Sequence, residues 1–424
     1  MASSNNSVAL VTGATGFLGK VVVEELLRQK HTLSLKSIIL LVRAKNGETA
    51  RQRFHNIIVP SACFSNLRPG WTDDVEVFDG DLSVPRCGLA DDVYDHVANN
   101  TTHIIHVAGC VKFNSPVPEA ISSNVDGVLN VLALGRSCDK LRRIVTTSTA
   151  YVSTAIGPVY AELSPLPVPP SQLYATLKAG NMNAEQAIGI TGHPNVYTLS
   201  KCLAEHLVVE QRANLSVTIV RPSIISAALK YPKPGWIDSK AAFAGLVLCF
   251  GKGILRVING RRDIKLDIVP VDEVASRLIQ EVFRGDHQPT VNASEFRVTF
   301  SVATDRCSLR ISEICRLLEQ EFNGMPGSDA RRFCFVGRGW LFKGFELLYH
   351  RGPLTLQSAY LGMRGETEKQ KQVKKALKIL KDMNAVFSHY TAQKYDFRPE
   401  EPSPMFEPTE YLRVVCSGVW EHLV

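Results

Sequence analysis

The chain has 424 residues, of which 45% are hydrophobic and 21% are charged. This length exceeds one ordinary domain and the composition excludes a disordered or fibrous protein, so we expect a soluble globular chain with two domains, or one domain with a sizeable lobe. The formal net charge of +7 suits a polyanionic ligand such as a phosphorylated cofactor, but it suits a solvated surface equally well.

The ten cysteines are scattered, without a C-x-x-C pair and without a Cys/His cluster at metal-ligand spacing. This usage favours reduced thiols in a cytoplasmic protein and offers no metal site. The most apolar stretch, residues 241–250, is about half of the ~20 residues that a membrane-spanning helix needs, so any membrane attachment should be peripheral. We expect no nucleic-acid partner, and no feature sets an oligomeric state.

In the first part of the chain, short β-branched runs alternate with helical patterns. The alternating segments are residues 8–13, 20–29, 37–43, 75–82, 103–109, 127–138 and 143–152. Such alternation predicts βαβ units and a doubly wound parallel sheet of the Rossmann type. We expect this α/β domain to span residues 1–285, with elements of a smaller substrate lobe from about residue 226. Residues 286–424 should form one more strand and a mostly helical C-terminal region.

The first strand breaks into a loop with three spaced glycines, Gly13, Gly16 and Gly19. Glycines at this spacing let the backbone turn sharply and approach a pyrophosphate, while the following helix offers its free N–H groups to that anion. The alternative is a purely structural strand-to-helix turn. A strand before the loop, a helix after it and a second strand about twenty residues on favour a cofactor loop, in which Thr15, Phe17 and Leu18 are further contacts.

The second strand is followed by Arg43, where an NAD-binding loop usually carries Asp or Glu for the ribose hydroxyl. Arginine suits a 2′-phosphate by charge and by bidentate geometry, so Arg43 and Arg53 favour NADPH over NADH. The alternative is that both arginines line a solvated surface. Asp81 and Leu82 follow the third strand and suit contact with the adenine ring, although a plain turn predicts the same residues.

Tyr197 and Lys201 are four residues apart, which places both side chains on one face of a helix. A neighbouring ammonium lowers the pKa of a tyrosine hydroxyl, so the pair predicts a proton donor. Ser148 and Thr149 are strand-end hydroxyls that could hydrogen-bond a substrate carbonyl oxygen. An exposed helical pair is the alternative for Tyr197 and Lys201 alone. The order of nucleotide loop, strand-end hydroxyls and Y-x-x-x-K on one α/β chain favours a carbonyl-reducing site.

With these motifs the chain resembles the extended short-chain dehydrogenase/reductases, and among them the fatty acyl-CoA reductases and related thioester reductases. The resemblance covers about residues 8–283, whereas "FSHYTAQKYDF" is only weakly similar to the family's terminal domain. It rests on "TGATGFLGK", "LLVRAKNG", "GDL", "STAYV", "GHPNVYTLSKCLAEH", "IVRPSII", "PGWID", "GKGILR" and "DIVPVDEV".

The resemblance implies that Tyr197 is the general acid and that Lys201 is its electrostatic partner and a ribose ligand. It makes Thr149 the third catalytic residue, with Ser148 as the alternate. It also brings Lys112 near the cofactor and turns Ser223 toward the nicotinamide. The implied reaction is the NADPH-dependent reduction of a fatty acyl thioester to an aldehyde, and on to a primary alcohol, with release of the thiol.

Because the chain carries no adenylation or carrier domain, its substrate should arrive activated, as acyl-CoA or on a separate acyl carrier protein. Residues 241–258 could form an apolar wall for the acyl chain, or an ordinary core helix. The basic helix over 369–381 could contact an anionic membrane, or present a solvated face. Two other functions remain open: a reductase of another carbonyl, such as a ketone or sterol, and a non-catalytic NADP-binding protein.

Overall fold

The computed structural model describes residues 7–113, 115–155, 157–286 and 294–424. A seven-stranded sheet with parallel pairing throughout lies at its centre, in the order β12-β7-β5-β4-β1-β2-β3. The order reverses between β1 and β4, so the predicted doubly wound fold is confirmed. The strands are β1 (Ser7–Thr12), β2 (Leu35–Val42), β3 (Val75–Asp79), β4 (His103–His106), β5 (Arg143–Thr147), β7 (Val217–Pro222) and β12 (Phe296–Ser301).

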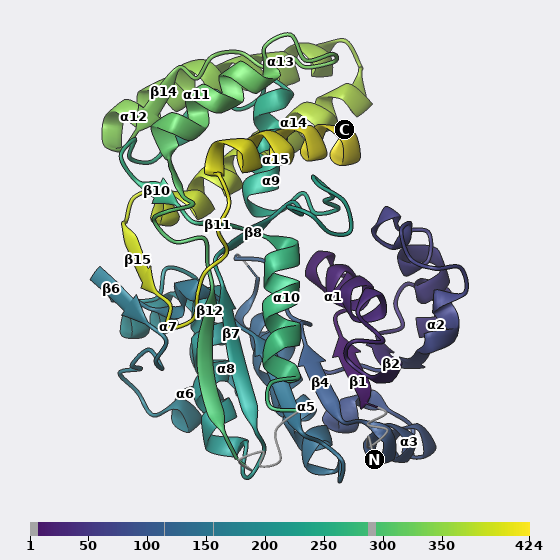
Figure 1. Ribbon diagram of the computed structural model, residues 1–424. Helices are drawn as coiled ribbons and strands as arrows, with labels where there is room; N and C mark the ends of the chain where they lie inside the picture. The colour runs from purple at the N-terminus through teal and green to yellow at the C-terminus, as the bar shows by residue number, and fades with distance from the viewer. Residues whose placement is uncertain (1–6, 114, 156, 287–293) are drawn as a thin grey trace.

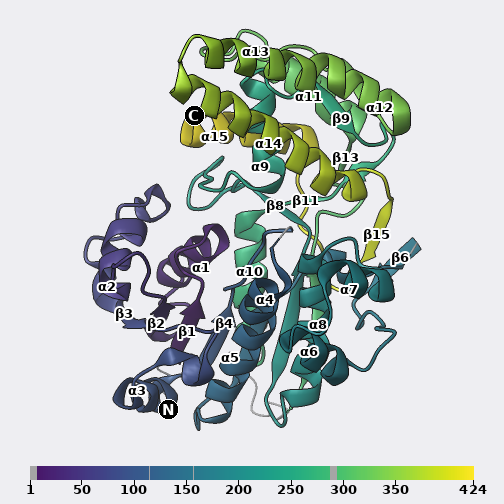
Figure 2. The same ribbon diagram turned by 180° about the vertical axis from the view of Figure 1, so that it is seen from behind.

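Helices cover both faces of the sheet, because successive residues of each buried strand point to opposite sides. Ala9 and Val11 of β1 pack in the core beneath α1 and α10, whereas Val8 and Leu10 pack in the core beneath the helices of the other face (Figure 1, Figure 2). The first face carries α1 (Phe17–Arg28) and α10 (Val271–Val282). The second carries α3 (Asp91–Asn100), α4 (Val117–Ile121), α5 (Gly127–Arg136), α6 (Pro170–Lys178) and α8 (Val196–Gln211). The short helices α2 (Ala50–Arg53) and α7 (Ala184–Thr191) complete this part of the fold.

A second, mostly helical lobe lies over the carboxyl ends of the strands (Figure 1). Its helices are α9 (Ala242–Gly251), α11 (Ile311–Phe322), α12 (Gly339–Glu346), α13 (Gly352–Met363), α14 (Thr367–Tyr390) and α15 (Pro408–Leu423). Short strand pairs bind it together: β8 (Ile224–Ser226) with β11 (Ile268–Pro270), β9 (Val257–Asn259) with β14 (Phe335–Gly337), β10 (Lys265–Leu266) with β13 (Leu309–Arg310), and β6 (Gly157–Tyr160) with β15 (Tyr395–Arg398). Within the described parts of the chain, no helix combines the length and the apolarity that crossing a membrane requires.

The expected boundary at residue 285 needs a correction. Beyond it, β12 pairs in parallel with β7 from Phe296 to Ser301 and forms an edge of the central sheet. The lobe elements that begin near residue 226 are also interrupted by α10, which returns to the sheet. Local sequence indicates a strand but not its partner, and this partner lies about eighty residues earlier in the chain.

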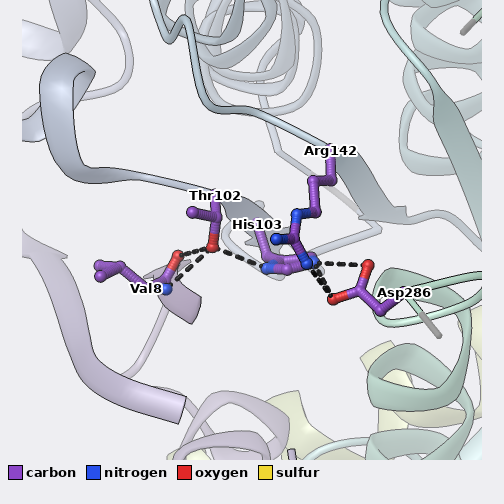
Figure 3. Close-up of polar contacts among 5 residues, drawn as sticks. All are labelled: Val8, Thr102, His103, Arg142 and Asp286. Carbon is purple, nitrogen blue, oxygen red and sulfur yellow. Dashed lines mark hydrogen bonds and ion pairs between the residues drawn. The ribbon is translucent and has the colours of Figure 1, made fainter. Parts of the chain in front are cut away.

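A closed polar network joins the amino ends of β1, β4 and β5 (Figure 3). The Thr102 hydroxyl accepts a hydrogen bond from the Val8 N–H at 2.8 Å and lies 2.8 Å from Nδ1 of His103. Nε2 of His103 lies 3.1 Å from the carboxylate of Asp286, to which Arg142 donates at 2.9 Å. Burial lowers the pKa of His103, so at neutral pH its ring is neutral and Nε2–H donates to Asp286.

Candidate active site

At the opposite end of the sheet, the carboxyl ends of the strands open into a cavity of about 690 Å³. Its lining includes the residues that follow β1, β2, β3, β4, β5 and β7, because parallel strands end at one edge. All sixteen residues singled out in the sequence line this cavity. They are Gly13, Thr15, Gly16, Phe17, Leu18, Gly19, Arg43, Arg53, Asp81, Leu82, Lys112, Ser148, Thr149, Tyr197, Lys201 and Ser223.

The glycine loop is packed so closely that side chains have no room in it. A Cβ atom at Gly13 would lie 2.6 Å from the Ala108 nitrogen, and one at Gly19 would lie 2.1 Å from the Gly13 oxygen. Gly13 also has a φ of +81°, which favours glycine. Gly16 caps α1 without a side-chain hydrogen bond, so the first-turn amides are left for an anion. This cradle fits the pyrophosphate of a dinucleotide.

The two arginines stand together at the far side of the cavity. Arg53 donates through Nη1 to the backbone oxygen of Arg43 at 2.5 Å, and the Arg43 side chain is exposed. Burial alone would raise the pKa of Asp81, but hydrogen bonds from Ser83 and the charge of Arg43 hold it below its usual range. The pair therefore presents positive charge beside the ionised carboxylate of Asp81.

Tyr197 and Lys201 lie on the first turns of α8. Asn195 caps this helix by accepting a hydrogen bond from the Thr198 N–H at 2.9 Å, which fixes where the helix begins. Both Tyr197 and Lys201 point into the cavity wall, and the Lys201 ammonium donates to the Thr147 backbone oxygen at 2.9 Å. The helix therefore holds the pair against the carboxyl end of β5.

The pKa of Tyr197 departs from the expectation. Burial raises it to about 12, and a hydrogen bond with the Thr149 side chain offsets only part of that rise. Lys201 is not among the groups that lower this pKa, and burial is the main cause of its rise. Burial also lowers the pKa of Lys201 to about 8, although Glu205 opposes this change. Tyr197 is thus a neutral phenol that can donate a proton at pH 7.

The two strand-end hydroxyls differ in their bonding. The Thr149 hydroxyl accepts a hydrogen bond from the Tyr151 N–H at 3.3 Å and also bonds Tyr197. The Ser148 hydroxyl is buried and has no hydrogen-bond partner among the described residues. Because an unpaired buried hydroxyl is unfavourable, Ser148 is available to a ligand that enters the cavity. Together with Tyr197, these hydroxyls can hold and protonate a developing oxyanion.

Two of the residues singled out in the sequence lie at the cavity but bond elsewhere. The Ser223 hydroxyl donates to the buried carboxylate of Asp267 at 2.5 Å. The Lys112 side chain is 76% exposed and forms an ion pair with Glu119 at 3.5 Å. Lys112 therefore stands at the mouth of the cavity, and Ser223 helps to join β7 to the lobe.

Asn124 is a buried residue near the site that the sequence reasoning missed. Its Oδ1 accepts from the Cys110 N–H at 2.8 Å, and its Nδ2 donates to the Ser200 hydroxyl at 2.9 Å. It thereby ties the loop after β4 to α8, where a Cβ atom at Gly109 would lie 3.1 Å from the Lys201 nitrogen. Asn124 lies among the polar residues Ser122, Ser123 and Asp126, so the local sequence offers no signal that singles it out.

The C-terminal lobe also contributes to the cavity, through Phe387 and Tyr390 at the end of α14. The Tyr390 ring lies 4.7 Å from that of Tyr151 and 5.7 Å from that of Phe113, which in turn lies 5.2 Å from Tyr197. Asn195 donates to the Tyr390 hydroxyl at 3.3 Å, so the residue that caps α8 also holds α14. The segment whose role was open therefore forms an aromatic wall near Tyr197.

For the apolar segment 241–258, the sequence left two interpretations open: an apolar wall for the acyl chain and an ordinary core helix. Of its residues, only Ala241 and Ala242 line the cavity, and the rest of α9 is packed in the core of the lobe with α11 and α15. This is the alternative of an ordinary core helix. The aromatic residues of α14, brought in from more than 180 residues beyond Tyr197, take that place.

Several known proteins are similar to this chain. Fatty acyl-CoA reductase 1 of Mus musculus is 35% identical over 273 residues, which cover 63% of this chain and 52% of that protein. Fatty acyl-CoA reductase wat of Drosophila melanogaster is 27% identical over 398 residues, 91% of this chain and 75% of the relative. The chain thus spans about half the length of the mouse relative.

Among solved structures, the terminal R domain from the myxalamid PKS-NRPS biosynthetic pathway aligns over 98% of this chain and 91% of its own, with a TM-score of 0.66 and 18% identity. The reductase (R) domain of a non-ribosomal peptide synthetase from Mycobacterium tuberculosis aligns over 99% and 92%, with a TM-score of 0.60 and 19% identity. The model of the male sterility protein family, an NAD-binding family, matches residues 11–278. The chain therefore belongs to this family, that of the fatty acyl-CoA and thioester reductases indicated by its motifs.

Proposed function

We propose that the chain is an NADPH-dependent reductase of fatty acyl thioesters that converts acyl-CoA to an aldehyde and then to a primary alcohol. One observation carries the proposal: a dinucleotide cradle, a buried phenol with an unpaired serine hydroxyl, and an aromatic wall all line the same cavity. The family is an NAD-binding one, and curated relatives are named fatty acyl-CoA reductases. These names support the substrate class.

In the proposed reaction, the bound nicotinamide supplies a hydride to the thioester carbonyl carbon. Tyr197 and Ser148 hold the carbonyl oxygen, and Tyr197 gives it a proton as negative charge develops there. The resulting hemithioacetal returns its hydroxyl proton to the site as the carbon–sulfur bond breaks, and the sulfur leaves as the thiol. The second reduction, from aldehyde to alcohol, requires that the oxidised cofactor be exchanged for a second NADPH. Because the aldehyde presents the same kind of oxygen, the same residues can hold and protonate it.

Lys201 has a positioning role in this scheme. Its ammonium donates to the Thr147 oxygen at the end of β5, close to Ser148 and Thr149. The remaining protons of the ammonium can reach the ribose hydroxyls of a bound dinucleotide, as the family resemblance implies. Burial lowers its pKa to about 8, so at neutral pH it is still charged and can donate as an ammonium.

The preference for NADPH rests on Arg43 and Arg53. If a 2′-phosphate binds the exposed Arg43 guanidinium, Arg43→Ala should raise the KM for NADPH about tenfold and leave the KM for NADH nearly unchanged, because charge-assisted hydrogen bonds are lost only for the phosphate. Steady-state kinetics with both cofactors measures this. The exposed Arg51, one turn away, provides the control as Arg51→Ala. Equal losses for both cofactors would contradict a phosphate contact.

The reaction is tested with purified chain, NADPH and acyl-CoA thioesters of increasing chain length. We expect NADPH consumption together with release of free thiol, and chromatography of the organic products should show aldehyde before alcohol. Tyr197→Phe should remove both signals. Reduction of simple ketones without turnover of any acyl thioester would overturn the proposal in favour of another carbonyl substrate. NADPH binding without turnover of either class would favour a non-catalytic protein.

A further inference from the structure

An apolar stripe lies exposed on the outer helices of the C-terminal lobe, and none of its residues lines the cavity. Helices α12 and α13 are joined by a π turn over Leu347–Arg351, so residues 339–363 run without a break in helical backbone. They form the outer edge of the lobe (Figure 1, Figure 2). The stripe consists of Trp340, Leu341, Leu347, Leu348, Leu356, Tyr360 and Met363. Trp340 is 80% exposed and Met363 is 81% exposed.

These residues share one face because of the π turn. In an α-helix, residues seven or eight positions apart lie nearly above one another, as Trp340, Leu347 and Leu348 do. A π turn holds about one residue more than an α turn, so the repeat continues at Leu356, eight residues after Leu348. Tyr360 and Met363 then follow at ordinary helical spacing.

The opposite face of the same helix is anchored to the lobe. Phe342, His350, Ser358 and Leu361 are buried, and they follow the same spacing on that face. Nε2 of His350 accepts hydrogen bonds from the backbone N–H groups of Arg256 at 2.9 Å and Val257 at 3.2 Å. The helix is thus held by one side, and every residue of the stripe keeps at least 42% of its surface exposed.

Positive charge surrounds the stripe. Residues 331–381 contain twelve Lys or Arg and three Glu, a net charge of +9, whereas the whole chain has +7. The surplus of basic residues is therefore confined to residues 331–381, which include α12, α13 and the first part of α14. Arg338, Lys343 and Arg364 are exposed on or beside α12 and α13. The lysines of α14 lie alongside, because α13 packs against α14, where Gln370 Nε2 donates to the Ser358 backbone oxygen.

We propose that this face docks on an anionic lipid bilayer, with the stripe inserted among the headgroups and the surrounding cations against lipid phosphates. An exposed stripe of Trp, Leu and Met on a helix flanked by basic residues is the pattern of an interfacial helix. The proposal does not depend on the reaction catalysed.

Trp340 reports on this contact directly. Of the four tryptophans, Trp71 and Trp236 are buried and Trp420 is half-buried, so Trp340 alone is highly exposed. We expect a blue shift of its fluorescence, and quenching by brominated lipid, when the full chain meets vesicles of phosphatidylcholine with phosphatidylserine. Trp340→Phe should remove both signals. Wild-type fluorescence unchanged by these vesicles would overturn the proposal.

Sedimentation with the same vesicles tests the stripe and the charges separately. Trp340→Ser combined with Leu348→Ser and Met363→Ser should weaken vesicle binding about 100-fold, because three inserted side chains are lost. Lys374→Glu with Lys378→Glu should weaken it at least tenfold on anionic vesicles only. Ile190→Ser, at an exposed apolar residue of α7, is the matched control and should change nothing.

Turnover of a short, soluble acyl thioester should be the same in all of these variants, which shows that they are folded. Vesicle binding that survives the triple substitution would overturn the proposal. So would a lipid-independent dimer, seen by analytical ultracentrifugation, that the triple variant abolishes, because the stripe would then be an interface between two copies. Binding of an acidic carrier protein at the stripe, without binding to vesicles, would also overturn it.

Discussion

The two ends of the central sheet carry polar side chains of the same kinds but pair them differently. At the amino end, Thr102, His103, Arg142 and Asp286 bond one another in a closed network. At the carboxyl end, the glycine loop leaves helix amides uncapped and Ser148 has no partner among the described residues. The comparison teaches that one end of these strands contributes to stability, whereas the other keeps its hydrogen-bonding capacity for a ligand.

The largest expected effect is at the carboxyl end, in Tyr197→Phe. Removing the proton donor should lower kcat/KM for the acyl thioester about 1000-fold. The melting temperature should stay within a degree or two, because the hydroxyl bonds only the Thr149 side chain. Steady-state kinetics and calorimetry measure the two quantities. Tyr94→Phe, which loses a buried hydrogen bond to Ser137 at 2.9 Å, is the matched control and should keep full activity.

At the amino end, Asp286→Ala should lower stability and leave activity unchanged, which is the reverse of the result expected for Tyr197→Phe. The substitution leaves the Arg142 guanidinium and the buried His103 N–H without their acceptor, which should cost about 2–3 kcal/mol of unfolding free energy. Turnover per folded molecule should not change. Urea unfolding compared with Asp95→Ala, at an exposed carboxylate of α3, measures the difference. A loss of turnover at unchanged stability would contradict the division between the two ends.

The sequence predicts the carboxyl end well, because each of its residues follows a buried run. Gly13, Arg43, Asp81 and Ser148 come directly after strands, and parallel strands end at one edge, so their convergence follows from local pattern. Helical spacing places Tyr197 and Lys201 on one face, and their order after the nucleotide loop and the strand-end hydroxyls indicates the site. The sequence therefore predicts where each of these residues stands in its own strand or helix.

What could not be predicted depends on contacts between distant parts of the chain. Tyr390 reaches the cavity because β15 pairs with β6, more than 230 residues earlier, and no local pattern records that pairing. The burial of Tyr197 likewise depends on how α8 packs against the rest of the chain, and this burial makes the pKa of Tyr197 differ from the expectation. The place of β12 in the sheet was missed for the same reason.

The pH dependence of activity should report the ionisation of Lys201, at the carboxyl end of the sheet. Because burial lowers the pKa of Lys201 to about 8, its ammonium is lost above that pH, and kcat/KM for NADPH should fall about tenfold per pH unit there. Lys201→Arg keeps a positive charge at all these pH values, so its decline should move to higher pH at a lower absolute rate. The same decline in both proteins would assign it to another group.

The smallest expected effect is on the pH dependence of stability, and it comes from two histidines at the two ends of one strand. β4 begins with His103 and ends with His106. Burial lowers the pKa of both rings, that of His106 to about 3, so the unfolded chain takes up protons below pH 6.5 that the folded chain does not. Stability is therefore lost as the pH falls, by up to about 1 kcal/mol per histidine between pH 7.5 and 5.5.

His103→Gln should remove the contribution of one buried histidine to the loss of unfolding free energy at low pH. His55→Gln, at an exposed ring, should leave the pH dependence of unfolding unchanged. Unfolding measured with saturating NADPH distinguishes the two ends of the strand further. The charge of Lys201 acts on His106, which bonds Thr12 beside the glycine loop at 2.8 Å, and His103 lies at the far end of the strand. Cofactor should thus raise stability by the same amount in wild type and His103→Gln. A cofactor effect that depended on His103 would show that the two ends are coupled through β4.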